Sequence, residues 1–328
     1  MLKDKIFRET IPYNNKTLYV SVTNKCQLHC PFCFNKFVEG FQNDKEELTP
    51  RKVIELIKEN DYDTIDFLGG EPLLNPQFII DIVKYFKNSN KSFCISSNLA
   101  FKSLSTLQLE ALWRIQKYSK SKISVGTSYN VDRFESTNYL NLWKKNMLFL
   151  DEFGINVGVT VTLTEKQSGQ SVDDLKSLLE SVKYKSVNIE RCNYSKPKDE
   201  VELEHIKQVS YKIDLYLKEC FKKFPLDKNY QFGRYYDSAY NRVPLMDPHC
   251  SHHTDIVFPD GTLKHGCCSN GVQEDDRDLL KKKLFENNCL ICEFYDFCKG
   301  DCECNRWTCT FPKETLQYIR ELIWREYK

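Results

Sequence analysis

Three cysteines near the start of the chain are the first residues whose types and spacing could do chemistry. They stand in the stretch "CQLHCPFC" as Cys26, Cys30 and Cys33. Disulfides need cysteines in pairs, and a structural zinc site takes four ligands. Thiolate sulfur suits iron-sulfur clusters, and a cubane held by three cysteines leaves one iron free for a ligand that is not protein. The spacing therefore predicts an open iron-sulfur cluster, with structural zinc as the less favoured alternative.

Further candidates follow at regular intervals. In "FLGGEP" the chain places Gly69 beside Gly70, although it has only 12 glycines. Adjacent glycines permit unusual backbone angles and let the main chain approach a ligand closely, although such a pair alone could also be a tight turn. Two polar triplets come later, "SSN" at residues 96–98 and "SYN" at residues 128–130. Because Ser and Asn are ordinary turn residues, these two are weaker signals.

The elements that must position these residues follow from periodicity. Between residues 17 and 190, short β-rich runs alternate with longer amphipathic stretches, which is typical of β-α units around a parallel sheet. In "TPRKVIELIKEN", Thr49 can cap a helix whose first turn holds Pro50. The predicted strands are 17–23, 64–68, 92–97, 122–128, 155–163 and 186–190. Six such units predict an α/β fold, a partial (β/α)6 TIM-like barrel.

The barrel places the candidate residues on one face. Functional groups of a parallel barrel gather on the loops after the carboxyl ends of its strands, and the four groups above follow the first four predicted strands in order. We expect the barrel over residues 1–190, a helical bridge over 191–249 with a long helix at 199–224, a cysteine-rich domain over 250–310 and a closing helix over 311–328.

Composition excludes several classes of function. The 47 Lys and Arg balance 46 Asp and Glu, so the net charge of +1 gives no global field to attract nucleic acid or an anionic membrane. The sequence has no apolar run near the roughly 20 residues of a membrane span and no apolar signal region at its start. We therefore expect a soluble, cytoplasmic protein with no nucleic-acid or membrane partner. In that reducing compartment, 15 cysteines favour metal ligation over disulfides.

The cysteine motif resembles that of a known family. Its spacing, with Phe32 just before the third cysteine, resembles the signature of the radical S-adenosylmethionine (radical SAM) enzymes. The resemblance implies that Cys26, Cys30 and Cys33 hold a [4Fe-4S] cluster whose open iron chelates the methionine moiety of SAM, with Phe32 against the adenine. Residues Gly69, Gly70, Glu71 and Pro72 match the family's GGEP element, which holds the methionine amino group. Ser97, Asn98 and Ser128 resemble positions that meet the ribose and carboxylate of SAM.

The later cysteines resemble the SPASM extension of that family, which carries two auxiliary [4Fe-4S] clusters. A quartet with spacing Cys-x2-Cys-x5-Cys-x3-Cys is formed by Cys289, Cys292, Cys298 and Cys302. The resemblance implies a distal cluster on Cys289, Cys292, Cys298 and either Cys309 or Cys304, and a proximal cluster on Cys302, Cys250 and Cys267. The fourth proximal position stays open between a free iron and one of Cys192, Cys268, His249, His252 or His253. A zinc-ribbon-like module is the alternative.

The remaining candidates lie near the barrel mouth or in predicted elements. Cys192 and Glu190 follow or end the sixth strand, and Tyr129 follows the fourth, so these three are candidate catalytic residues. Cys94, in an apolar strand, and Cys220, on the long helix, are expected to be buried small hydrophobes.

The resemblance also implies a reaction. Reductive cleavage of SAM would give a 5'-deoxyadenosyl radical that abstracts hydrogen from a ribosomal precursor peptide, forming a thioether or carbon-carbon crosslink. Epimerisation is the first alternative, because "DGTLKHGCCS" resembles the context in which an epimerase cysteine, here Cys268, returns a hydrogen atom. Oxidation like that of sulfatase maturases is less expected, since Cys268 stands where those enzymes carry an acid.

The expected partners follow from this chemistry. A flavodoxin or ferredoxin would supply electrons, and a separate protein could bind a leader peptide, because the first predicted strand begins after only sixteen residues. A zinc-binding or electron-carrier protein without SAM chemistry is the hypothesis from another class.

Overall fold

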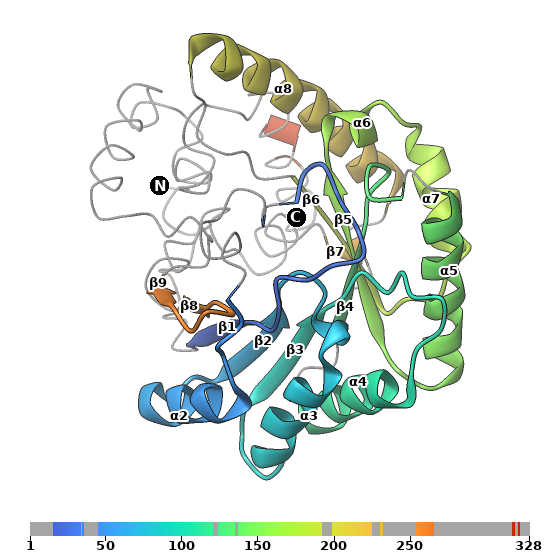
Figure 1. Ribbon diagram of the computed structural model, residues 1–328. Coiled ribbons are helices and arrows are strands. Elements are labelled where there is room, and N and C mark those ends of the chain that lie inside the picture. Colours follow the sequence, from blue (N-terminus) through green and yellow to red (C-terminus); the bar gives the residue numbers. More distant parts are fainter. Residues whose placement is uncertain are drawn as a thin grey trace, which may run out of the picture.

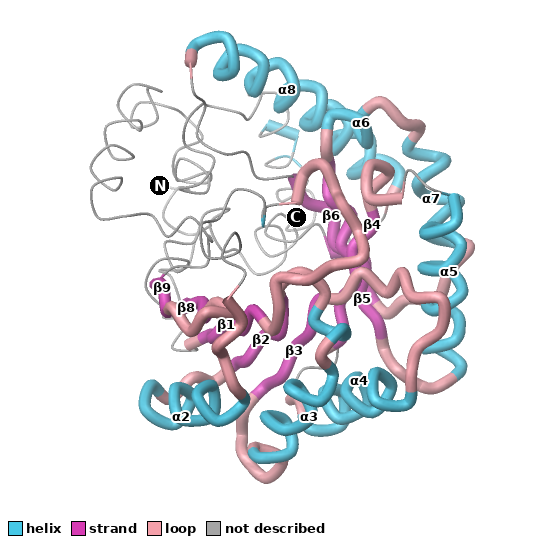
Figure 2. Tube along the Cα trace, in the orientation of Figure 1, coloured by secondary structure: helices cyan, strands magenta, loops and turns pink. Residues whose placement is uncertain are grey.

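A curved parallel sheet, covered on its outer side by helices, is the main feature of the computed structural model (Figure 1). The structure describes residues 16–33, 35, 45–120, 124–134, 137–191, 199–224, 230–231, 254–265, 317–318 and 321. Figure 2 shows the strands as an inner layer and the helices as an outer one. This arrangement confirms the predicted α/β class and is consistent with a partial barrel.

The six predicted strands are all present and parallel, each beside the next. They are β1 (Thr17–Ser21), β2 (Thr64–Leu68), β3 (Ser92–Ser96), β4 (Val125–Tyr129), β5 (Val157–Leu163) and β6 (Ser186–Arg191). Three short strands were not predicted: β7 (Tyr230–Gln231), β8 (Thr254–Val257) and β9 (Leu263–His265). The order is β7-β6-β5-β4-β3-β2-β1-β8-β9, and only the β8–β9 pair is antiparallel within the described sheet.

Helices α2 and α8 each begin directly after a residue whose side chain caps the helix amino terminus. Thr49 caps the first of them, its hydroxyl accepting from the Lys52 amide at 3.3 Å, and Pro50 fills the first turn. The predicted long helix is confirmed, with Asp199 as its amino-terminal cap. The helices are α2 (Pro50–Asn60), η3 (Pro72–Leu74), α3 (Pro76–Tyr85), α4 (Thr106–Tyr118), α5 (Thr137–Glu152), α6 (Glu165–Ser168), α7 (Val172–Glu180) and α8 (Glu200–Lys223).

The two faces of the sheet differ in chemistry because side chains alternate along each strand. Ile65 and Phe67 of β2 and Phe93 of β3 are fully buried in the core shared with the outer helices. The concave face takes the intervening residues, which are mainly small or polar. In β2 to β5 they are Thr64, Asp66, Leu68, Ser92, Cys94, Ser96, Gly126, Ser128, Gly158, Thr160 and Thr162.

The two cysteines expected to be buried hydrophobes have different surroundings. Cys220 is buried in α8, as predicted. For Cys94 the expectation is wrong, because the residue is only partly buried and lies on the polar concave face. The strand looked apolar, but its alternation puts Phe93 and Ile95 into the core and Cys94 on the other side.

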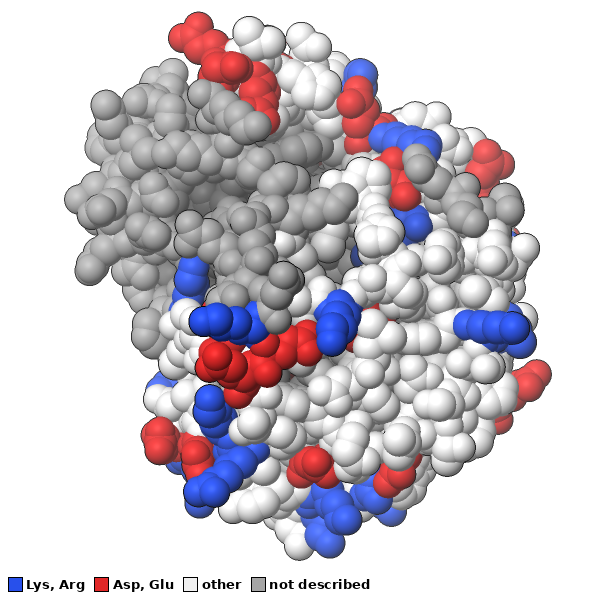
Figure 3. Space-filling model, viewed as in Figure 1, with Lys and Arg blue, Asp and Glu red and all other residues white. Residues whose placement is uncertain are grey.

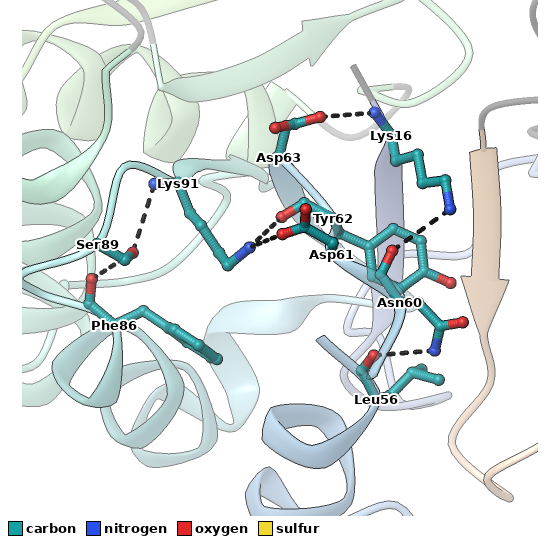
Figure 4. A network of polar contacts seen from close by, with 9 residues as sticks. All are labelled: Lys16, Leu56, Asn60, Asp61, Tyr62, Asp63, Phe86, Ser89 and Lys91. Carbon is teal, nitrogen blue, oxygen red and sulfur yellow. Dashed lines mark hydrogen bonds and ion pairs between the residues drawn. The ribbon is translucent and has the colours of Figure 1, made fainter. Parts of the chain in front are cut away.

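The amino-terminal ends of the first three strands are held together by a polar network (Figure 4). The Lys16 amide donates to an Asp63 carboxylate oxygen at 2.9 Å, and the Lys16 ammonium donates to the Asn60 carbonyl. The Lys91 ammonium donates to the Tyr62 carbonyl and lies 3.6 Å from Asp61. These contacts lie at the amino-terminal ends of the strands. The candidate site residues lie at the opposite, carboxyl ends.

Much of the predicted cysteine-rich domain lies outside the described residues. Of residues 250–310 only 254–265 are described, and they form the β8–β9 hairpin that extends the sheet beside β1. Residues 317, 318 and 321 are helical, within the predicted closing helix. The division into domains stays a prediction. No helix in the described ranges is both long and apolar enough to cross a membrane.

Candidate active site at the carboxyl ends of the strands

The three cysteines of the opening motif lie on the loop that follows β1. Cys30 is buried, while Cys26 and Cys33 are partly exposed. The Cys33 amide donates to the Cys30 carbonyl at 3.2 Å, which closes a tight turn. No three His, Cys, Asp or Glu side chains in the described ranges are grouped so that they could hold one metal ion. A cubane cluster does not need that grouping, because each thiolate binds a different iron atom.

The sulfur of Cys26 accepts hydrogen bonds typical of a cluster ligand. The Leu28 amide donates to it at 3.4 Å and the Asn98 side-chain amide at 3.6 Å. Burial raises the pKa of the Cys26 thiol, the Leu28 amide opposes that rise, and the nearby acidic groups Glu71, Cys30 and Cys33 add to it. Iron supplies the positive charge that ionises such thiols. The donor set therefore fits an iron-sulfur cluster.

The paired glycines bring the loop after β2 against the cysteine loop. The Gly70 amide donates to the Thr23 carbonyl at 2.7 Å and the Glu71 amide to the Lys25 carbonyl at 2.8 Å. A Cβ on Gly70 would lie 2.2 Å from the Lys25 carbonyl oxygen, and one on Gly69 would lie 2.6 Å from that of Thr23. Gly69 also has a φ of 139°. The close approach predicted for these glycines is therefore made, in this structure, to the chain's own cysteine loop.

The Glu71 side chain is fully buried and joins the loops after β2 and β3. Its carboxylate accepts from the Leu73 amide at 3.0 Å, the Ser97 hydroxyl at 2.8 Å and the Asn98 amide at 2.7 Å. Burial raises the pKa of Glu71 to about 7, while these donors and the charge of Arg133 oppose the rise. The Glu71 carboxylate is thus engaged by hydrogen bonds from the protein itself. Any contact of the GGEP element with SAM would have to come from its backbone.

Asn98 links the loop after β3 to the cysteine loop. Its side-chain oxygen accepts from the Gln27 side-chain amide and the Ala100 amide, both at 2.9 Å, while its nitrogen donates to Cys26. Ser97 is occupied by Glu71. The assignment of Ser97 and Asn98 to SAM stays a prediction, and in this structure both position the loops that carry the cysteines and the glycines.

Ser128 and Tyr129 are the last two residues of β4, so the strand ends one residue later than the predicted range 122–128. Ser128 lies on the concave face, in register with Thr160. The Tyr129 ring packs with Phe134 and Trp143, at centroid distances of 6.0 and 5.8 Å, and burial raises the pKa of its phenol. A SAM contact for Ser128 and a catalytic role for Tyr129 stay predictions.

Arg133, in the turn after β4, is a site residue that the sequence analysis missed. Its guanidinium carbon lies 5.8 Å from the centroid of the Phe32 ring, and its charge lowers the pKa of Glu71. Its Nε is buried without a hydrogen-bond partner among the described residues. A single arginine in a polar loop gives no motif. The only available signal was its position three residues after Asn130, at a predicted strand end.

The other predicted site residues are not placed. The backbone of Glu190 belongs to β6, in register with Thr162, but its side chain is outside the described part. Also outside are Cys192, Cys250, Cys267, Cys268, Cys289, Cys292, Cys298, Cys302, Cys304 and Cys309. Their assigned roles stay predictions.

Comparisons with known proteins agree with this site. Residues 20–179 match the model of the radical SAM superfamily. An uncharacterized protein of Methanocaldococcus jannaschii is 32% identical over 180 residues, 52% of this chain and 58% of that protein. The chain thus spans little more than half of that relative. The GTP 3',8-cyclase of Helicobacter pylori is 26% identical over 259 residues, 71% of this chain and 74% of the cyclase.

Solved structures show the same fold. The structure of anSMEcpe with bound AdoMet has a TM-score of 0.63 at 13% identity, covering 95% of this chain and 96% of that one. The same neighbour has been solved with AdoMet and the Cp18Cys peptide. At this identity the solved structures show the fold alone. Residues 20–179 are therefore identified as a radical SAM superfamily domain.

Proposed function

We propose that this enzyme modifies a ribosomal precursor peptide and forms a thioether or carbon-carbon crosslink in it. The observation that carries the proposal is the joining of three loops at the carboxyl ends of β1, β2 and β3. Gly70 and Asn98 fasten the cysteine loop to its neighbours, at the rim of a polar concave face. Such a site can hold a reactive cofactor at one end and an extended substrate along the sheet.

Different residues would bind the cluster and SAM. Cys26, Cys30 and Cys33 would hold the cluster, and the donors on the Cys26 sulfur would stabilise its charge. Arg133 would pair with the carboxylate of SAM, because its Nε has no partner among the described residues. When bound, the cluster and SAM supply a 5'-deoxyadenosyl radical, and the protein has to orient the substrate and exclude water.

A peptide fits the concave face better than a nucleotide triphosphate does. None of the described side chains on the concave face of β1 to β6 is a lysine or an arginine, and Asp66 adds an acid there. A triphosphate needs cations, so this face disfavours GTP despite the similarity to a GTP 3',8-cyclase. The peptide complexes of anSMEcpe support the same choice. On the described part of the face in Figure 3, acidic and basic side chains are interspersed and form no basic patch.

The predicted auxiliary clusters support crosslinking over other outcomes. Crosslinking is oxidative, so an electron must leave the substrate, and clusters on the later cysteines could accept it. A flavodoxin or ferredoxin reductant, a cytoplasmic location and a separate leader-binding protein remain part of this proposal. Epimerisation through Cys268 is its alternative, supported by the "DGTLKHGCCS" segment.

The test is product mass in deuterated water. Anaerobically reconstituted enzyme is incubated with SAM, dithionite and the short peptides encoded beside its gene, with GTP in a parallel reaction and the Cys26→Ala variant as the inactive control. A loss of about two mass units per event is expected for crosslinking, because two hydrogens leave the peptide. A gain of about one unit would indicate epimerisation by solvent-derived hydrogen, and conversion of GTP alone would overturn the peptide proposal. A wild-type enzyme that makes no 5'-deoxyadenosine would contradict radical SAM activity itself.

A further inference from the structure

Asp66 occupies the middle of β2, on the concave face and three residues before Gly69. Its neighbours along the strand, Ile65 and Phe67, are fully buried in the core under the helices, so Asp66 points to the opposite side. The strand register places it between Tyr19 of β1 and Cys94 of β3. The carboxyl group therefore faces the space below the loops that carry the cysteine motif.

One oxygen of this carboxyl group lacks a partner within the described protein. Its Oδ1 is buried and receives no hydrogen bond from any described residue. A buried carboxylate without a cation or donors is costly, and burial raises the pKa of Asp66 to about 7. The adjacent Cys94 cannot compensate, because burial and the charge of Asp66 together raise the pKa of its thiol to about 12. A purely structural position would favour a neutral side chain here.

A cation that carries N–H groups would satisfy both the unpaired Oδ1 and the charge of the ionised carboxyl group. No described side chain on the concave face of β1 to β6 is a lysine or an arginine. A neutral N–H could satisfy one oxygen, but a cation would also offset the cost of ionising the buried carboxyl group. A peptide substrate with a lysine or arginine could supply such a cation.

We propose that Asp66 binds a cationic side chain, lysine or arginine, of the peptide substrate and so selects which part of the peptide lies against the concave face. The proposal rests on the peptide function proposed above. Asp66 is then a specificity-determining residue beneath the SAM site, and Cys94 forms the wall beside it.

The proposal gives binding a defined dependence on pH. Among the described residues, Tyr19 and Cys94 are the titratable groups that face Asp66 from the neighbouring strands. The Cys94 thiol stays neutral near pH 7, because its pKa is raised. The carboxylate fraction of Asp66 grows as the pH passes about 7, so the affinity for a cationic peptide should increase between about pH 6 and 8.

Fluorescence polarisation can measure this selection without turnover. The probes are the fluorescein-labelled peptide encoded beside the gene, the same peptide with each lysine or arginine replaced by norleucine, and a version with glutamate there. They are titrated into reconstituted enzyme with SAM and no reductant. Wild type should bind the parent peptide about tenfold more tightly than one of the norleucine peptides, in line with one charge-assisted contact. Asp66→Asn should remove this difference, and Asp66→Lys should prefer the glutamate peptide. Asp81→Asn, on the outer helix α3, should behave like wild type.

The outcomes separate the two proposals. Equal charge preference in wild type and Asp66→Asn, or equal binding of all peptides by wild type, would overturn the role of Asp66 and leave the peptide function standing. An enzyme that cleaves SAM but binds no peptide would overturn both. Iron content and melting temperature check the folding of each variant. If a variant misfolds, wild-type enzyme still tests the proposal, because an affinity for the parent peptide that does not rise between about pH 6 and 8 would overturn it.

Discussion

Gly70 is a residue at which one carbon atom decides whether two loops can meet. A Cβ there would lie 2.2 Å from the Lys25 carbonyl oxygen, and both partners are backbone. We expect Gly70→Ala to destabilise the protein by about 1–3 kcal/mol and to lower SAM cleavage at least tenfold, because the cysteine loop must move. Iron content and 5'-deoxyadenosine formation measure this. Gly169→Ala is the control, since its Cβ would meet nothing closer than 3.4 Å. A Gly70→Ala enzyme with normal iron and activity would show that the loops can separate freely.

Asn98 should affect the reduction potential of the SAM-binding cluster through its hydrogen bond to the Cys26 sulfur. Its side-chain amide donates to that sulfur at 3.6 Å, and hydrogen bonds to ligand sulfur are among the factors that set cluster potentials. Asn98→Ala should leave more negative charge on the sulfur and lower the reduction potential of the SAM-binding cluster. Potentiometric titration followed by electron paramagnetic resonance measures it. Asn75→Ala, which removes an exposed side chain that makes no cap hydrogen bond, should leave the potential unchanged.

Asp66 should make the stability of the protein depend on pH in a specific direction. Burial raises the pKa of its carboxyl group from 3.8 to about 7, so the folded protein holds this proton more tightly than the unfolded chain does. The associated stabilisation is complete below about pH 4 and is lost as the pH rises to about 7. The melting temperature of Asp66→Asn relative to wild type should therefore increase between pH 5 and pH 8, measured by calorimetry. A difference for Asp66→Asn that stays constant with pH would contradict the raised pKa.

At the scale of elements, a side-chain hydrogen bond adds to the backbone pairing that holds β8 beside β1. The Tyr62 hydroxyl, at the start of β2, donates to the Asp255 carboxylate of β8, and the Tyr62 ring is only 1% exposed. Tyr62→Phe keeps the ring and removes the donor, so it should cost about 1–2 kcal/mol of unfolding free energy. Denaturant titration measures the loss. Tyr85→Phe, on the exposed side of α3, should change the stability by less than about 0.5 kcal/mol. Equal effects of the two substitutions would mean that β8 does not depend on this bond.

The elements that were predicted share a local cause. Thr49, Pro50 and the apolar spacing of α2 act within one stretch of sequence, so they could be read from it. The short strands β8 and β9 could not, because β8 is defined by pairing with β1, at the other end of the chain. The face on which Cys94 lies is also a property of the sheet, since a shift of one residue would move it to the other side.

At the scale of the whole molecule, the number of clusters is the property that most needs measurement. One SAM-binding cluster and two auxiliary clusters would give about twelve iron atoms per chain, four in each cubane. Replacing Cys26, Cys30 and Cys33 together by alanine should leave about eight. Iron and sulfide analysis of anaerobically reconstituted protein measures both. A wild-type content of about four would remove the auxiliary clusters from the proposal and, with them, the route by which an electron leaves the substrate.

The sequence by itself determined the chemistry of the centre and the order of its parts. Three cysteines at fixed spacing, a glycine pair and alternating elements are local patterns, and local patterns are enough to predict a cluster loop at the end of the first strand of a parallel sheet. Only the tertiary structure decided what these residues contact. Gly70 meets Lys25, Asn98 reaches Cys26, Arg133 lies over Phe32, and Asp66 turns away from the core beside Cys94. Each of these contacts joins different strands or loops, and strand register and helix packing, which no single stretch of sequence contains, bring them together.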